Sequence, residues 1–312
     1  MKNLWPLLTP EDIASVLLKY RSFISQYHST SQNFEFCNGY ILQSTRNGLG
    51  VKEFEDGMVL YTKKRSGEWV IVACVGNDRA RKIIETAKEL FDESDKPVII
   101  KNVDKALETE LLPECRYYSV DEWWDEQAKY DDNTFPELIL NTENTVKLDG
   151  SIYHSLREEQ NRFAKEYSIE FKEVLNPNIE SINPLLDTWI NSMHLRNGWG
   201  KDELRASHAM FCEPQEGLFH YEVSDSKSGN LTGFLVFSEI SKICLGYNVL
   251  INDFSYRNLY RSLMLEGAKI AKGKGYTHLN IQGSEDAEQY TSKLRLKPEL
   301  KIYKEHLIYE VT

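Results

Sequence analysis

Hydrophobic and polar positions change their spacing along this chain in a way that predicts alternating helices and strands. In residues 9–24 the apolar side chains Ile13, Val16, Leu17 and Tyr20 recur at helical spacing after a Thr-Pro-Glu-Asp start. Such a start supplies a cap, an early proline and acids near the helix N-terminus. The pattern therefore predicts an N-terminal helix.

The rest of the first half predicts short strands around one long helix. Apolar runs bounded by polar or glycine-containing turns predict strands at Tyr40–Leu42, Met58–Tyr61, Trp69–Val75 and Lys96–Lys101. Helical spacing predicts a helix from Asp78 to Phe91 and a short one from Ala106 to Leu112. The acidic stretch Val120–Phe135 is expected to be a connector that packs its aromatic residues.

The second half repeats this order of elements without a repeat at the level of residues. Helices are predicted at Ile152–Tyr167, Ile182–Leu195 and Leu259–Lys272, and strands at Gly217–Val223, Leu231–Ile240, Cys244–Ile251, His278–Ile281 and Lys304–Val311. Each half thus consists of helices, an antiparallel meander and a strand–helix–strand crossing. We expect an α/β (α+β) fold of two related modules, residues 1–149 and 150–312, each a mostly antiparallel mixed sheet flanked by helices.

Charge is unevenly distributed over the 312 residues, whose net charge is −11. Residues 104–143 contain 12 acids and 3 bases, whereas residues 255–304 contain 10 bases and 5 acids. A basic segment in an acidic protein can form a local phosphate site, although a solvated basic surface explains the same pattern.

The remaining composition indicates a globular protein without a metal site. Its five cysteines lie outside metal-binding spacings and are expected to be reduced thiols. No apolar run reaches the ~18 residues of a membrane span, and the N-terminus lacks a signal-peptide core. We therefore expect a cytoplasmic protein.

The most informative stretch combines the turn Tyr256–Ser262, the helix that follows it, and the segment Tyr276–Asp286. Together with the charged helix Leu156–Tyr167 and the strand Gly233–Glu239, this stretch resembles the C-terminal domain of phosphatidylglycerol lysyltransferases. The resemblance covers most of residues 152–311 in order and is more diffuse over residues 34–112. It implies two tandem GNAT-like folds and transfer of an aminoacyl group from aminoacyl-tRNA to a lipid or small amine.

Two features of the sequence affect the choice of donor, one a departure from coenzyme A sites and the other a departure from the resembled family. Tyr260 and Ser262 stand where a coenzyme A site would have glycines, and side chains there obstruct a diphosphate at the helix N-terminus. Acetyl-CoA is therefore disfavoured as a cofactor but stays open as an alternative. The usual basic central helix is diluted by Glu158, Glu159 and Glu166, which weakens the interpretation as a tRNA-binding protein.

Three functions remain open from the sequence. The first is an acyltransferase, most simply one that passes an aminoacyl group from tRNA to an amine or hydroxyl of a small molecule, peptide or lipid. The second is an N-acyltransferase that uses acyl-CoA or an acyl-carrier protein. The third is a non-catalytic GNAT-like binding module.

Candidate site residues follow from these positions. Residues expected to bind the donor or its phosphates are Arg257, Asn258, Tyr260, Arg261, Lys293, Arg157 and Arg162. Asn258 takes the place of a turn glycine, which asparagine can do because it tolerates a left-handed backbone. Candidate general bases are Glu239, Asp253 and Glu285. Candidate substrate contacts are Trp199, Asn248, Asn280, Ser284 and Asp286.

Overall fold

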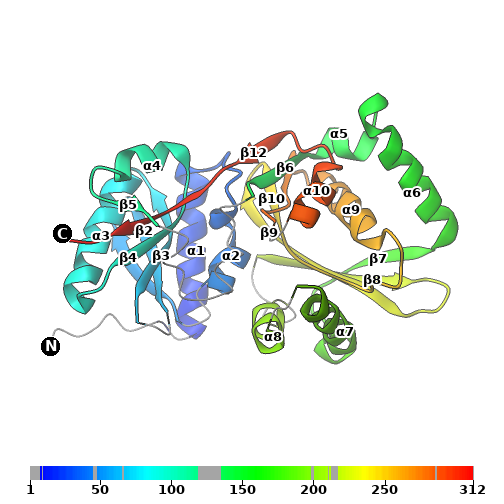
Figure 1. Ribbon diagram of the computed structural model, residues 1–312, viewed down its shortest axis with the longest axis horizontal. Coiled ribbons are helices and arrows are strands. Elements are labelled where there is room, and N and C mark those ends of the chain that lie inside the picture. Colours follow the sequence, from blue (N-terminus) through cyan, green and yellow to red (C-terminus); the bar gives the residue numbers. More distant parts are fainter. Residues whose placement is uncertain are drawn as a thin grey trace.

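The chain forms two mixed sheets, each with helices against both faces (Figure 1). The computed structural model describes residues 8, 10–44, 48–64, 67–118, 135–197, 200–209, 211, 217–284 and 287–311. The acidic connector expected from residue 120 onwards lies outside the described residues as far as residue 134.

The first sheet begins as an antiparallel meander and ends in a parallel crossing. The elements of this half are α1 (Pro10–Tyr27), η1 (Phe34–Phe36), α2 (Asn38–Ser44), β1 (Gly50–Phe54), β2 (Gly57–Lys63), β3 (Trp69–Gly76), α3 (Arg79–Ser94), β4 (Val98–Val103), α4 (Lys105–Leu111) and β5 (Arg116–Tyr117). β1, β2 and β3 pair antiparallel, and α3 returns the chain so that β4 pairs parallel with β3.

The second sheet follows the same plan. Its half contains β6 (Glu137–Asn141), α5 (Thr142–Lys147), η4 (Ser151–Tyr153), α6 (His154–Glu166), β7 (Ile169–Val174), α7 (Ile179–Asn197), α8 (Lys201–Ala209), β8 (Leu218–Asp225), β9 (Leu231–Ser241), β10 (Cys244–Asn252), α9 (Leu259–Gly273), β11 (His278–Asn280), α10 (Ala287–Leu294), β12 (Leu300–Ile302) and β13 (Glu305–Tyr309). β7 to β10 pair antiparallel, and α9 returns the chain so that β11 pairs parallel with β10.

The chain crosses between the sheets near its C-terminus. The strand order is β1-β2-β3-β4-β13-β5 in the first sheet and β12-β6-β11-β10-β9-β8-β7 in the second. β13 therefore leaves the half from which it comes and pairs with β4, while β6 pairs with β11. These pairings show which strands each sheet contains. They do not define a domain boundary, so the division expected between residues 149 and 150 stays a prediction.

A shared core joins the two sheets. Side chains from α1, α2 and α7 belong to one buried cluster together with Val70 and Val72 of β3 and Val236 and Val249 of the second sheet. Figure 1 shows α1 and α2 between the sheets. Separate clusters fill the outer faces, one beneath α3 and α4 and the other beneath α5, α6 and α9.

Most elements predicted from the sequence are confirmed, and the predicted strand at Tyr40–Leu42 is wrong. This stretch lies inside α2. Three consecutive apolar residues fit either structure, and here Ile41 and Leu42 are buried as part of a helix. The predicted last strand exists as β13, but it pairs in the first sheet rather than beside its neighbours in sequence.

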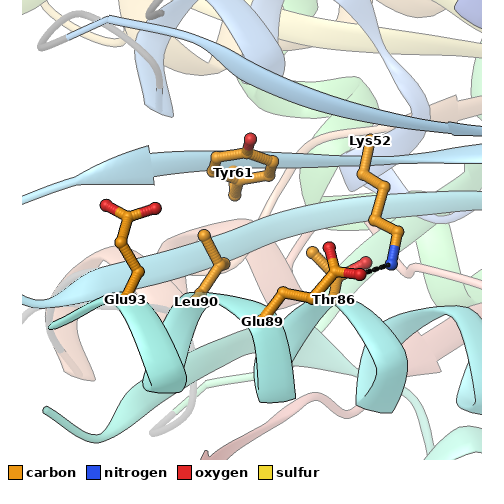
Figure 2. A pocket seen from close by; sticks show the side chains of 6 residues that line it. All are labelled: Lys52, Tyr61, Thr86, Glu89, Leu90 and Glu93. Carbon is orange, nitrogen blue, oxygen red and sulfur yellow. Dashed lines mark ion pairs between the residues drawn. The ribbon is translucent and has the colours of Figure 1, made fainter. Parts of the chain in front are cut away.

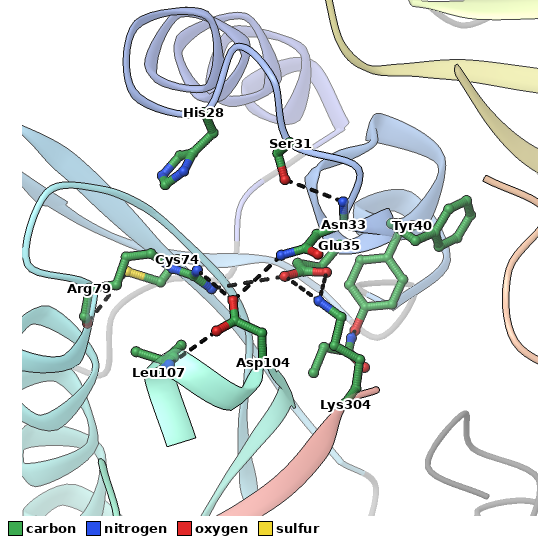
Figure 3. A network of polar contacts seen from close by, with 12 residues as sticks. His28, Ser31, Asn33, Glu35, Tyr40, Cys74, Arg79, Asp104, Leu107 and Lys304 are labelled. Atoms are coloured by element: carbon green, nitrogen blue, oxygen red, sulfur yellow. Dashed lines mark hydrogen bonds and ion pairs between the residues drawn. The ribbon is translucent and has the colours of Figure 1, made fainter. Parts of the chain in front are cut away.

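A buried ionic network lies at the point where the chain crosses. Lys304, just before β13, places its Nζ 2.9 and 2.8 Å from the two carboxylate oxygens of Glu35 in η1. Arg79 at the start of α3 pairs with Asp104 at 3.2 Å, and Figure 3 shows these four side chains grouped together. Because ions taken out of water lose several kcal/mol each, such groups are tolerated when each has a partner.

Glu137 of β6 adds a further carboxyl group to this network. Its Oε2 accepts hydrogen bonds from Phe34 N at 3.0 Å and from Asn280 Nδ2 of β11 at 2.7 Å. The pKa of Glu137 is raised to about 7, mainly by burial; Lys304 lowers this pKa and the Glu35 carboxylate raises it. The network thus ties η1 and β13 of the first sheet to β6 and β11 of the second.

We predict that Lys304→Ala destabilises the fold by about 3–5 kcal/mol, because it leaves buried Glu35 with only Arg79, 3.9 Å away, as a cationic partner. Lys304 is 3% exposed and Glu35 is 2% exposed. Denaturant-induced unfolding measures the effect. The control is Lys301→Ala, an exposed lysine of β12 whose loss is expected to cost about 0.5 kcal/mol or less. A Lys304→Ala variant as stable as this control would contradict the role of the pair.

We predict that the unfolding free energy gained from Glu137 decreases as the pH rises. The pKa of Glu137 is about 7 in the folded protein and about 4.3 in an unfolded chain. The folded state therefore binds the proton more tightly, and its stabilisation is lost between these values as the pH increases. Relative to Glu137→Gln, the wild type should lose on the order of 2 kcal/mol between pH 5 and pH 8.

Equilibrium unfolding at several pH values tests this prediction. Glu305→Gln, which removes an exposed carboxylate from β13, serves as the control. A constant difference between the wild type and Glu137→Gln across this range would show that Glu137 titrates alike in both states.

Candidate functional site

The carboxyl ends of the parallel strands β10 and β11 form the candidate site. In α/β folds, ligands bind where neighbouring parallel strands end and the loops after them separate. β11 pairs with β10 only from Cys244 to Gly246, whereas β10 continues to Asn252 along β9. Beyond Gly246 this edge of β10 therefore faces a gap where the described β11 has already ended.

A bulge in β10 shapes this gap. The register with β9 shifts between Tyr247 and Val249, so Asn248 is an extra residue. Tyr247 packs in the core beneath α9, whereas Val249 packs in the core between the sheets. The bulge thus leaves the carbonyl groups of Tyr247 and Asn248 within reach of one donor.

Side chains from both halves fix Asn248. Its Oδ1 accepts a hydrogen bond from Ser238 of β9 at 2.7 Å, and its Nδ2 lies 3.4 Å from Cys37 Sγ. A Cβ added at Gly39 of α2 would lie 2.0 Å from Asn248 Nδ2. Glycine is therefore what allows α2 to approach β10 at the bulge.

Gln282 bridges the gap. Its Nε2 donates to the carbonyl oxygen of Tyr247 and, at 3.2 Å, to that of Asn248. Its backbone has a φ of +61°, and its N–H donates to Asn280 Oδ1 at 2.7 Å. The predicted substrate residue Asn280 is fully buried and also donates to Gln32 O and Glu137. A chain of hydrogen bonds therefore connects the ionic network to the gap.

The turn before α9 keeps the expected backbone without a glycine. Asn258 is the N-cap residue of α9 with φ +67° and ψ 8°, which confirms the left-handed conformation predicted for it. Ser262 N donates to Asn258 O at 3.1 Å, so the helix begins immediately after the turn.

Helix α6 covers the first turn of α9. Arg261 forms an ion pair with Glu159 of α6, and both side chains are mostly buried. Gln160 Nε2 donates to Ser262 Oγ at 3.0 Å. Of the residues of α6, Leu156 and Phe163 are buried and hold the helix against the outer core. The positive charge expected to clamp a phosphate is thus neutralised within the protein.

The other predicted donor residues lie in different surroundings. Arg257 and Arg162 are exposed, and Tyr260 is half-buried on the first turn of α9. Arg157 donates to the carbonyl oxygens of Leu148 and Gly150, and buried Lys293 donates to those of Ile281, at 2.8 Å, and Gly283. The structure therefore brings Arg257, Asn258, Tyr260 and Arg261 together, while Arg157 and Lys293 hold backbone segments.

The two described candidate general bases, Asp253 and Glu239, lie near opposite ends of β10. Asp253 follows β10 directly, and its Oδ1 accepts from Ser255 N at 2.8 Å. Glu239 pairs with Leu245 at the other end of β10, roughly 20 Å of strand away. There it forms an ion pair with Arg21 and accepts from Tyr276 Oη at 2.8 Å. Burial, and then the Glu239 carboxylate, raise the pKa of Tyr276.

Of the remaining predicted site residues, one is described and three are not. Ser284 is 2% exposed, and its Oγ has no hydrogen-bond partner among the described residues. Glu285, Asp286 and Trp199 lie outside the described residues. The assigned roles of all these residues stay predictions.

Sequence reasoning missed Glu137, Glu159 and Gln282 as functional residues. Glu137 begins an otherwise apolar strand, which is a signal for a buried carboxyl group. Gln282 lay within the Tyr276–Asp286 stretch, but nothing local marks its contact with β10. The pairing of Glu159 with Arg261 joins residues 102 positions apart.

The corresponding end of the first sheet is filled. His28 Nε2 accepts a hydrogen bond from Gly76 N, at 3.3 Å, where β3 ends. Burial, together with the nearby Arg79 charge, lowers the pKa of His28 to about 4, so the ring is a neutral acceptor. Arg79, the first residue of α3, is held by Asp104 and Glu35. The two crossings thus share a plan but differ at the end where a ligand would bind.

A small pocket on the first sheet lies apart from this site. Figure 2 shows its lining residues, which come from β1, β2 and α3: Lys52, Tyr61, Thr86, Glu89, Leu90 and Glu93. Lys52 Nζ lies 3.0 Å from Glu89, so its charge is already paired.

Among the described helices, none combines the length and apolar character that a bilayer crossing requires.

Solved structures share this architecture. A conserved protein of unknown function from Bacteroides thetaiotaomicron VPI-5482 is 16% identical with a TM-score of 0.73, covering 98% of this chain and 100% of that one. L-PGS from Bacillus licheniformis is 13% identical with a TM-score of 0.66, covering 99% and 94%. A tandem GNAT protein from the clavulanic acid biosynthesis pathway is 10% identical with a TM-score of 0.53, covering 98% and 97%. These likenesses show the fold.

The sequence itself matches one family. No curated protein matches the chain. The family model described as phosphatidylglycerol lysyltransferase, C-terminal, matches residues 26–297, which include β1 to β11 and the gap between β10 and β11. The chain therefore belongs to the phosphatidylglycerol lysyltransferase C-terminal family, and it is a transferase of the tandem GNAT fold.

Proposed function

We propose that this protein is an aminoacyltransferase that takes its aminoacyl group from aminoacyl-tRNA and passes it to an amine or hydroxyl. The observation that carries the proposal is the contact of Glu159 and Gln160 with the first turn of α9. This contact occupies the first turn of α9, where a coenzyme A diphosphate would bind. The gap between β10 and β11 still contains polar groups, namely Gln282 and the carbonyl groups of Tyr247 and Asn248. Family membership supports the aminoacyl group as the one transferred.

The charges at α9 favour a donor without a diphosphate. A helix N-terminus binds phosphate when its N–H groups are open to the ligand. Here the Ser262 hydroxyl is bonded to Gln160, and a diphosphate beside Arg261 would meet the Glu159 carboxylate. Like charges at such a distance oppose binding. Coenzyme A is therefore not part of the reaction that we propose.

The proposed reaction needs little beyond positioning. The acceptor nitrogen or oxygen attacks the ester carbonyl carbon, the new amide or ester bond forms, and the bond to the ribose oxygen of tRNA breaks. The proton lost by the acceptor is finally taken up by that ribose oxygen. An activated ester held beside its nucleophile reacts largely through proximity. Among the described candidate bases, Asp253 is the one at this end of β10.

The charge pattern limits how much of the tRNA is bound. Several bases of the basic segment already pair with acids, as Lys272 does with Glu143 and Lys274 with Glu173. Arg257 and Arg162 are exposed on the turn before α9 and on α6. We propose that they contact phosphates near the 3′ end. The acceptor is a small molecule, peptide or lipid, reached from the cytoplasmic side because charged tRNA is made there.

We predict that Arg257→Ala lowers kcat/KM for charged tRNA about tenfold and reduces the slope of log affinity against log salt by about one. The measurement is transfer from tRNA charged with radiolabelled amino acids to phosphatidylglycerol vesicles, to a polyamine mixture and to a peptide mixture. Arg295→Ala, which removes an exposed cation beyond α10, is the matched control and should change neither quantity.

A coenzyme A titration tests the same proposal from the other side. Neither coenzyme A nor acetyl-CoA should raise the melting temperature of the wild type. Stabilisation at micromolar coenzyme A, together with no transfer from any charged tRNA, would replace this function with an acyl-CoA-dependent one.

A further inference from the structure

We propose that the Gln282 side chain stands in for the ammonium group of the transferred aminoacyl moiety, and that the two carbonyl groups it bridges are the recognition site for that ammonium. This inference rests on the proposed function, because the aminoacyl donor brings the ammonium. It assigns to Gln282 a role in selecting the donor.

The first step concerns the two carbonyl groups. Tyr247 O and Asn248 O belong to a largely buried strand, and buried backbone carbonyls are almost always hydrogen-bonded. Elsewhere in the sheet a neighbouring strand supplies the donor, but β11 pairs no further than Gly246. Here Gln282 Nε2 donates to both carbonyl oxygens.

The second step concerns how Gln282 is held. Its φ of +61° is unusual for a residue with a side chain and persists when surrounding contacts require it. Those contacts are Asn280 Oδ1 on its N–H and Leu138 N on its carbonyl oxygen, at 2.7 and 3.2 Å. The backbone is therefore fixed, while the half-buried side chain is free to rotate away once another donor occupies the carbonyl groups.

The third step concerns the ligand chemistry. Two carbonyl oxygens from adjacent residues converge on one nitrogen, which is an arrangement suited to a group with several N–H donors. A carboxamide offers two neutral donors, whereas an ammonium offers three and a positive charge. Hydrogen bonds with a charged donor are roughly twice as strong as neutral ones. An ammonium would therefore displace the carboxamide.

Two unsatisfied groups indicate that a ligand completes this end of the sheet. Asn252 Oδ1, at the end of β10, and Ser284 Oγ, beyond β11, have no hydrogen-bond partner in the described part of the chain. The two residues are 3% and 2% exposed. Buried polar atoms without partners are rare and mark places where a ligand or water binds. They lie on the continuations of the two strands that Gln282 connects.

The test compares two stable analogues of the aminoacyl end of tRNA. One is adenosine with an alanylamino group at its 3′ carbon, and the other carries propionylamino and so lacks only the ammonium. Calorimetry should show that the wild type prefers the alanyl form by about tenfold or more. Gln282→Ala removes the internal competitor and should tighten the alanyl form about tenfold further, leaving the propionyl form unchanged.

Controls separate this role from a general disturbance of the site. Gln282→Met keeps the bulk of the side chain without its donors, and it should shift the preference in the same direction. Gln26→Ala, on an exposed glutamine of α1, should match the wild type. Thermal unfolding checks that each variant is folded.

The possible results separate the ammonium site from the proposed aminoacyl transfer. Equal affinity for both analogues, a parallel change in Gln282→Ala, or no binding of either analogue overturns the inference. If the wild type transfers amino acids from charged tRNA without distinguishing the analogues, the inference fails and the proposed function stands. Selective binding of the alanyl form without transfer from any charged tRNA supports the ammonium site and overturns the proposed reaction.

Discussion

The buried ion pair between Lys304 and Glu35 is the interaction on which the rest of the structure depends. It lies where the chain leaves the second sheet to add β13 to the first, and it buries the Lys304 charge at this point. A buried cation is stable only with a partner, and Glu35 provides one from η1. Glu137 completes the cluster as a carboxyl group whose raised pKa allows it to carry a proton near neutral pH.

This constraint reaches the candidate site through hydrogen bonds. Glu137 orients Asn280, Asn280 holds the backbone of Gln282, and Gln282 binds the carbonyl groups at the β10 bulge. The position of the gap is therefore coupled to the crossing of the chain. The first sheet has the same strand–helix–strand plan, but there His28 and Arg79 fill the corresponding end. Of the two strand–helix–strand crossings, only the one in the second sheet has the gap among the described residues.

Local patterns predicted most of the elements, because helix periodicity and apolar runs are properties of neighbouring residues. α1, α3, α9 and β3 agree closely with their predicted ranges. The apolar run in α2 predicts a strand where the structure has a helix. The short polar helix α10 has no pattern that predicts it. The pairing of β13 with β4 follows from tertiary contacts that periodicity does not contain.

The candidate site likewise has features that the sequence predicts locally and features that depend on distant contacts. The left-handed backbone at Asn258 was predictable because it depends on one residue in a turn. The neutralisation of Arg261 by Glu159 and the contact of Glu239 with Arg21 were not, since each joins distant segments. These pairings change the chemistry, because they place Glu239 away from the gap and leave Arg261 without a free charge for phosphate.

A crystal structure with a stable 3′-aminoacylamino-adenosine tests the central claim most directly. The account predicts the ammonium on the carbonyl oxygens of Tyr247 and Asn248, with Gln282 rotated away and Glu159 still paired with Arg261. An analogue bound elsewhere, or a coenzyme A diphosphate seated at the first turn of α9 with α6 displaced, would contradict it.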